Sequence, residues 1–181
     1  MDEVRPARCS GCEAASRPAG MGLVLHGHGL RSRQQRGPLE VGGVPRTVVL
    51  QARRYRCTQC PAVLLVVARG VLRFKHFSGS AVALAIVLWG AMSLSAREVR
   101  EQVNPWRIVG HTACMTWASL HRWVREVRAG RLFSGVGAFP AQWELRDVAR
   151  EAALSIAAAA PPSWASRPLE QRTFAGGAHM A

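Results

Sequence analysis

Apolar and polar residues follow different patterns in the first and second parts of the chain. Before residue 78, aliphatic and β-branched residues gather in short runs between glycine- and proline-rich stretches, which is typical of strands and turns. From residue 80 onward, apolar residues recur at helical spacing. The pattern predicts an α+β fold, in which a small β-rich N-terminal part precedes an α-helical bundle. The runs that predict strands are 23–26, 47–55 and 63–67.

Four helices are predicted in the second part. We expect the first, an apolar run, to be buried, because it is shorter than the roughly 20 residues that a membrane-spanning helix needs. The second begins at Ser95-Ala96-Arg97-Glu98, which matches a capping box. The last ends at an alanine run before Pro161-Pro162. The predicted helices cover residues 80–92, 95–103, 112 or 116 to 128, and 140–160.

Residues 161–181 mix proline, serine, glycine and alanine with little periodic apolar content. Such a segment buries too little apolar surface to offset the entropy that is lost when it becomes ordered. The composition therefore predicts a disordered C-terminal tail over residues 161–181.

Four of the five cysteines form two Cys-x-x-Cys pairs, Cys9 with Cys12 and Cys57 with Cys60. No signal-peptide pattern opens the chain, so we expect a cytoplasmic location in which thiols stay reduced. Two such pairs supply the four soft ligands of a closed tetrahedral zinc site, which predicts one structural Zn²⁺ ion. The long insertion between the pairs is explained by a hairpin. Free incidental thiols and a redox Cys-x-x-Cys are the alternatives.

Three further residues, His26, His28 and Cys114, carry side chains that can serve as metal ligands or reactive groups. His26 and His28 lie two apart and share a face of a strand, and the interpretation that we favour is ordinary surface histidines. Cys114 is expected to be a small buried residue in a helix.

The formal net charge is +13, from 24 basic and 11 acidic residues, and residues 1–135 carry all of the excess. This balance indicates a polyanionic partner, of which double-stranded DNA is the first candidate. We expect no membrane association, no small-molecule substrate and, as a possibility left open, a homo-oligomer.

The third predicted helix has two distinct faces. Trp117, Leu120, Val124 and Val127 form an apolar stripe, and Ser119, Arg122 and Arg125 lie opposite. One packed face and one arginine-containing face suit a helix that reads base edges in the major groove. A solvated basic face on an ordinary bundle helix is the alternative. The residues that this hypothesis assigns to DNA bases are Ser119, Arg122 and Arg125.

The chain resembles the N-terminal zinc ribbon and helix-turn-helix of bacterial insertion-sequence transposases, and related short proteins, over about residues 5–130. An insertion, Asn104 to Cys114, separates the two helices. The resemblance implies a DNA-binding role, with Arg53, Arg54 and Arg56 of the ribbon on phosphates. The motifs are Cys9-x-x-Cys12, His26-Gly27-His28-Gly29-x-Arg31, Arg53-Arg54-Tyr55-Arg56-Cys57-x-x-Cys60, Leu94–Val99 and Trp117–Val124.

Transposases of this type use three carboxylates that hold two metal ions in a longer catalytic domain. Glu144, Asp147 and Glu151 follow ordinary helix spacing here, and Asp147 is the only aspartate after residue 81. We therefore expect a non-catalytic protein, a transposase-like DNA-binding part or a derived regulator, near the nucleoid. The predicted domains are a zinc ribbon (1–77), a helix-turn-helix-like domain (78–135), an additional helix (136–160) and the tail (161–181).

The sequence also allows two other functions. In the first, zinc only stabilises the fold, and the apolar helices form a protein-interaction or oligomerisation module. Six tryptophans favour this reading. In the second, the ribbon binds RNA, although Tyr55 is the only tyrosine available to stack on bases.

Overall fold

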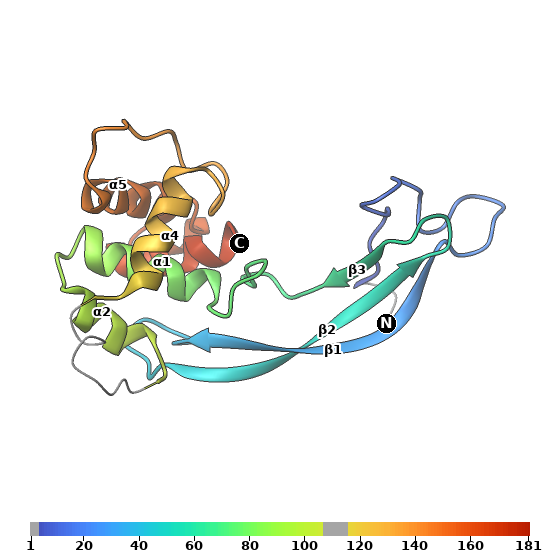
Figure 1. The fold of residues 1–181 in the computed structure, drawn as a ribbon, viewed down its shortest axis with the longest axis horizontal. Coiled ribbons are helices and arrows are strands. Elements are labelled where there is room, and N and C mark those ends of the chain that lie inside the picture. Colours follow the sequence, from blue (N-terminus) through green and yellow to red (C-terminus); the bar gives the residue numbers. More distant parts are fainter. Residues whose placement is uncertain (1–3, 107–115) are drawn as a thin grey trace. The chain divides into compact units, whose positions relative to one another are not determined.

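The computed structural model describes residues 4–106 and 116–181, and it confirms a mixed α and β fold (Figure 1). Three strands form one antiparallel sheet in the order β1-β2-β3. The predicted strands are present, but the first is much longer than its short apolar run. The strands are β1 (Leu25–Gly37), β2 (Arg46–Cys57) and β3 (Val63–Val66).

The helices of the described residues follow the sheet in sequence. They are α1 (Gly79–Gly90), α2 (Ala96–Val103), α4 (Ala118–Arg128), α5 (Leu145–Ala158), the short 3₁₀ helix η2 (Pro162–Trp164) and α6 (Leu169–His179).

The chain divides into two compact units. Unit 1 comprises residues 1–34 and 49–68, and unit 2 comprises residues 35–48 and 69–181. The turn end of the β1–β2 hairpin, residues 35–48, therefore belongs to unit 2, which also contains the helices. There the Arg36 N–H donates to the His76 carbonyl at 2.7 Å, and the Arg36 carbonyl accepts from the Ser78 N–H at 3.2 Å.

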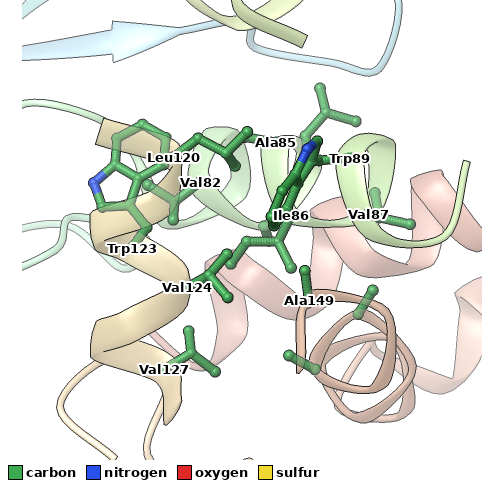
Figure 2. Packing of buried hydrophobic residues seen from close by; sticks show 14 of the residues in the cluster. Val82, Ala85, Ile86, Val87, Trp89, Leu120, Trp123, Val124, Val127 and Ala149 are labelled. Carbon is green, nitrogen blue, oxygen red and sulfur yellow. The ribbon is translucent and has the colours of Figure 1, made fainter. Parts of the chain in front are cut away.

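Helix α1 is the centre of unit 2, and every one of its residues is buried. Ser78 caps its first turn by accepting from the Ala81 N–H at 3.0 Å. Helices α2, α4, α5 and α6 all contact it, and Figure 2 shows Leu120 and Val124 of α4 facing it. The prediction of a buried apolar helix is confirmed. None of the helices described has the length and apolar character needed to span a membrane.

Two predicted helix starts are corrected, and a third is confirmed. Helix α5 begins at Leu145 rather than at Pro140, because residues 140–143 form a turn in which the Trp143 N–H donates to the Pro140 carbonyl. Helix α4 begins after Trp117, without a side-chain cap. At α2, both hydrogen bonds of the Ser95–Glu98 capping box are present.

The prediction of a disordered tail is wrong, because residues 169–179 form helix α6 against α1 and α5. Gly176 and Gly177 are both buried there. A Cβ atom on Gly176 would lie 1.9 Å from the Ile156 carbonyl oxygen, and one on Gly177 would lie 2.4 Å from the Ala83 Cβ. The helices meet through bare backbone, so the segment needs few large apolar side chains to pack.

Candidate metal centre

The four paired cysteines meet in unit 1, on two turns at the end of the sheet. The first turn, Cys9 to Cys12, is closed by the Glu13 N–H, which donates to the Cys9 carbonyl at 2.9 Å. The second turn follows β2, where the Cys57 N–H donates to the Ala62 carbonyl at 3.1 Å before β3 begins. The cysteines are free thiols rather than disulfides.

The sulfur positions fit a tetrahedral metal ion. The Cys9 and Cys60 Sγ atoms are 3.6 Å apart, the Cys12 and Cys57 Sγ atoms are 3.8 Å apart, and all four lie within 4.8 Å of one another. A tetrahedron with metal–sulfur bonds of about 2.3 Å has sulfur–sulfur edges of about 3.8 Å. The four cysteines are thus placed to hold one metal ion, with no coordination position left open.

Backbone amides support both turns. The Gly11 N–H donates to Cys9 Sγ, and the Gln59 N–H donates to Cys57 Sγ, each at 3.4 Å. A Cβ atom on Gly11 would lie only 3.0 Å from the Ala62 Cβ, so a larger residue in the first turn would press against Ala62. Such N–H···S bonds stabilise thiolate charge and orient the ligands.

Without a cation, the four thiols do not ionise alike. The Gly11 N–H lowers the pKa of Cys9 to about 7. The pKa of Cys60 rises to about 12: the Ala62 N–H alone would lower it, but burial and the three neighbouring thiols outweigh that effect. One negative charge is therefore accommodated easily, and four require a metal ion among them.

Metal affinity should fall steeply as the pH is lowered. The Ala14 N–H and the Cys60 thiol lower the pKa of Cys12, but burial and the Cys9 and Cys57 thiols outweigh them, so that this pKa is raised. Cys12 and Cys60 are therefore protonated at neutral pH, and both must lose a proton when a metal binds. We expect the association constant for Zn²⁺ or Co²⁺ to fall by about 100-fold or more per pH unit below pH 7.5. Competition titrations at several pH values check this, and an affinity independent of pH would contradict thiolate ligation.

The core of unit 1 is small. Its buried apolar members besides the cysteines are Val24, Leu25 and Tyr55 in one cluster, together with Ala52. The Arg5 guanidinium lies 5.8 Å from the centre of the Tyr55 ring. So little buried surface does not hold a domain of this size by itself. We therefore expect metal binding by the four cysteines to contribute much of the stability of unit 1.

The arginines assigned to phosphates all lie on β2 in unit 1. Arg53 and Arg54 are half-buried, and Arg56 is exposed. The Arg54 Nε donates to the His28 carbonyl at 3.1 Å. Arg56 and the exposed His26 line an open hollow of about 620 Å³ beside Cys57 and Cys60, whereas neither His26 nor His28 belongs to the four-cysteine cluster.

The residues assigned to bases lie on α4 in unit 2. Its predicted apolar stripe is buried, and on the other side Arg122 and Arg125 are exposed and Ser119 is half-exposed. His121, on the same helix, has a lowered pKa because it is partly buried, with a smaller effect from Arg125. Its ring packs edge-on against Trp89 at 5.2 Å between centroids.

Sequence reasoning missed two contributions to this region. Trp123 lay outside the predicted stripe but is 1% exposed, and its ring packs against Phe77 and Trp117 at 5.0 and 5.1 Å. Lys75 bonds Glu126 of α4 at 2.5 Å. No local pattern reveals this ion pair, because its members lie 51 residues apart. Cys114 and the start of the third helix at Thr112 lie outside the described residues.

In comparisons with protein-family models, with curated proteins and with solved structures, nothing matches this chain.

Proposed function

We propose that this chain is a non-catalytic DNA-binding protein with one structural zinc ion, similar to the DNA-binding part of insertion-sequence transposases. The observation that carries the proposal is the division of α4 into a buried apolar face and an exposed arginine face. Arg122 and Arg125 are exposed one turn apart, and neither has an ion-pair partner among residues 4–106 and 116–181. They are therefore available to a polyanion.

Zinc suits the site better than a hard cation. Ca²⁺ and Mg²⁺ prefer oxygen ligands, whereas four thiolates in a tetrahedron suit Zn²⁺. A closed site holds the fold and leaves no position for a reacting water. The proposed ion would therefore be held by Cys9, Cys12, Cys57 and Cys60, and it would fix the two cysteine turns to each other at that end of the sheet.

The charge of unit 1 favours nucleic acid. Its sequence contains eight arginines against three acidic residues. Three of the eight arginines lie on β2, and of these Arg56 is exposed whereas Arg53 and Arg54 are half-buried, so Arg56 is accessible to a phosphate. In this proposal, arginines of unit 1 bind phosphates and those of α4 approach base edges, which separates affinity from specificity.

The placement of the acidic residues supports a non-catalytic role. Glu98 is used in the capping box of α2, Glu101 pairs with Arg97 at 3.0 Å, and Asp147 pairs with Arg150 at 2.9 Å. Each of these three carboxylates has a local structural contact. Within the described residues, the one cluster that could hold a metal ion is made of cysteines.

The direct test is binding of the zinc-loaded protein to labelled duplex DNA over a salt series, with single-stranded RNA of matched sequence in parallel. Each phosphate that an arginine neutralises releases a bound counterion, which makes the slope of log affinity against log salt more negative by about 0.9. A steep duplex slope with a sequence preference supports the proposal. Weak binding without preference for either nucleic acid would contradict it.

Arg122→Ala and Arg56→Ala should have different effects. The first should reduce affinity for the preferred sequence by about tenfold or more, and it should relax sequence preference, because a bidentate base contact is worth roughly 1–3 kcal/mol. The second should weaken binding to all sequences and lower the salt slope by about one. Arg56→Ala tests phosphate binding more directly than Arg54→Ala would, since Arg54 also donates a hydrogen bond to the His28 carbonyl.

A control for both variants is Arg150→Ala on α5, whose exposed side chain pairs with Asp147. Its binding should stay near that of the unchanged protein. Equal effects of Arg122→Ala and Arg56→Ala on every sequence would remove the assignment of separate roles.

The two alternatives have less support. Trp89, Trp117 and Trp123 are buried in the core of unit 2, so these three do not form a surface for oligomerisation. Tyr55 is 1% exposed, so it is not available to stack on an RNA base. An RNA preference in the titration, or an oligomer whose mass does not change when DNA is added, would favour these alternatives instead.

A further inference from the structure

Two arginines of β2 extend across β1 at its glycines. The guanidinium of Arg53 lies over Gly27: a Cβ atom on that glycine would meet the Arg53 Nη2, Cζ and Nε atoms at 3.0, 3.8 and 3.9 Å. Arg54 reaches the same strand two residues further on. Its Nε donates to the His28 carbonyl at 3.1 Å, and its Nη2 lies 4.0 Å from where a Cβ atom of Gly29 would stand.

This arrangement brings two positive charges to one edge of the sheet. Successive residues in a strand point to opposite faces, so Arg53 and Arg54 leave β2 on different sides. Strand β1 lies at the edge of the sheet, next to β2. Both guanidinium groups nevertheless reach β1, because two of its positions carry no side chain.

Both side chains are also held before any partner arrives. Arg53 and Arg54 are half-buried, in contrast to the exposed Arg56. A guanidinium group that is already placed loses less conformational freedom when it binds a phosphate oxyanion. In the described part of unit 1, no carboxylate forms an ion pair with either arginine.

We propose that Gly27 and Gly29 seat Arg53 and Arg54 across β1, and that this edge of the sheet binds phosphodiester groups of duplex DNA. The inference rests on the DNA-binding function proposed above and assigns it a place on unit 1. Gly27 is a positioning residue: it touches no phosphate, and it acts by leaving room for the Arg53 guanidinium.

Gly27→Val tests whether Gly27 makes room for the Arg53 guanidinium, because valine fills the space under Arg53 and is itself favoured in strands. Gly29 is the poorer probe, since its φ of +80° strains any other residue. Gly22→Val is the matched control, because a Cβ atom at Gly22 would have no neighbour within 4 Å. Arg53→Ala and the double variant Gly27→Val with Arg53→Ala complete a cycle.

Duplex binding over a salt series is the measurement. We expect Gly27→Val and Arg53→Ala each to lower affinity roughly three- to tenfold and to reduce the salt slope by about one, with the double variant no worse than either. Gly22→Val should bind as the unchanged protein does. The metal content and the melting temperature of Gly27→Val should equal those of the unchanged protein. If Gly27→Val loses its metal, Gly27→Ala, which adds a smaller side chain, gives the same comparison.

The outcomes separate this inference from the proposed function. If the unchanged protein does not bind DNA, the proposed function fails. If it binds, the inference is overturned when Arg53→Ala binds normally. It is also overturned when Arg53→Ala weakens binding but Gly27→Val does not, or when the two effects add in the double variant.

Discussion

Removal of the metal ion is expected to unfold unit 1 and leave the helices of unit 2 folded. Cys57→Ser should have the same effect, because Cys57 is 2% exposed and its thiol is one of four ligands. Structural zinc sites contribute an apparent binding free energy on the order of 10 kcal/mol at neutral pH, which exceeds the stability of a typical small domain. The apolar cluster of unit 1 is too small to replace it.

Amide hydrogen exchange on the full chain measures this directly. After chelation, the amides of residues 49–57 should exchange as in an unfolded chain, while those of α1 stay protected. Cys114→Ser, which keeps both Cys-x-x-Cys pairs, is the control and should bind metal normally. Protection of β2 that persists after complete metal removal would contradict a structural role for the ion.

Gly176→Ala should destabilise unit 2 by about 3 kcal/mol or more. The added Cβ atom would lie 1.9 Å from the Ile156 carbonyl oxygen, and no side-chain rotation relieves a clash with backbone. Helix α6 would have to move away from α5. We expect this movement to cost more than the ordinary 1–3 kcal/mol of overpacking, and to outweigh the roughly 1 kcal/mol by which alanine is favoured over glycine in a helix.

Urea denaturation followed through tryptophan fluorescence gives the free energy of unfolding. Gly137→Ala is the matched control, since a Cβ atom there would have no neighbour within 4 Å, and its midpoint should stay unchanged. A normal midpoint for Gly176→Ala would mean that α6 does not pack against α5 in solution.

The parts of the fold that sequence reasoning predicted correctly are those with local signals. The Ser95–Glu98 capping box, the apolar run of α1 and the two Cys-x-x-Cys pairs each contain their structural information within a few residues. The two Cys-x-x-Cys pairs are also predicted to lie close together, because one metal ion needs four ligands. This is why the four-cysteine cluster could be predicted although 44 residues separate its halves.

The parts that sequence reasoning missed depend on contacts between distant residues. Strand β1 continues to Gly37 through a polar stretch, because pairing with β2 rather than burial of side chains holds it. Helix α6 packs through glycines, which hydrophobic periodicity does not register. Trp123 is buried because Phe77, far from it in the sequence, completes its surroundings.

The two units are interleaved along the chain rather than joined end to end. The polypeptide passes from one to the other between residues 34 and 35, returns between 48 and 49, and leaves again between 68 and 69. A truncation after residue 77 would therefore take Arg36 and Gly37 away from the helical unit, where a Gly37 Cβ atom would lie 2.3 Å from the Ala81 Cβ. By the same reasoning, one proteolytic cut in the 66–70 segment would leave both units connected through β1 and β2. The helical unit is thus not a portable module: a gene rearrangement that transfers it intact must carry the hairpin as well.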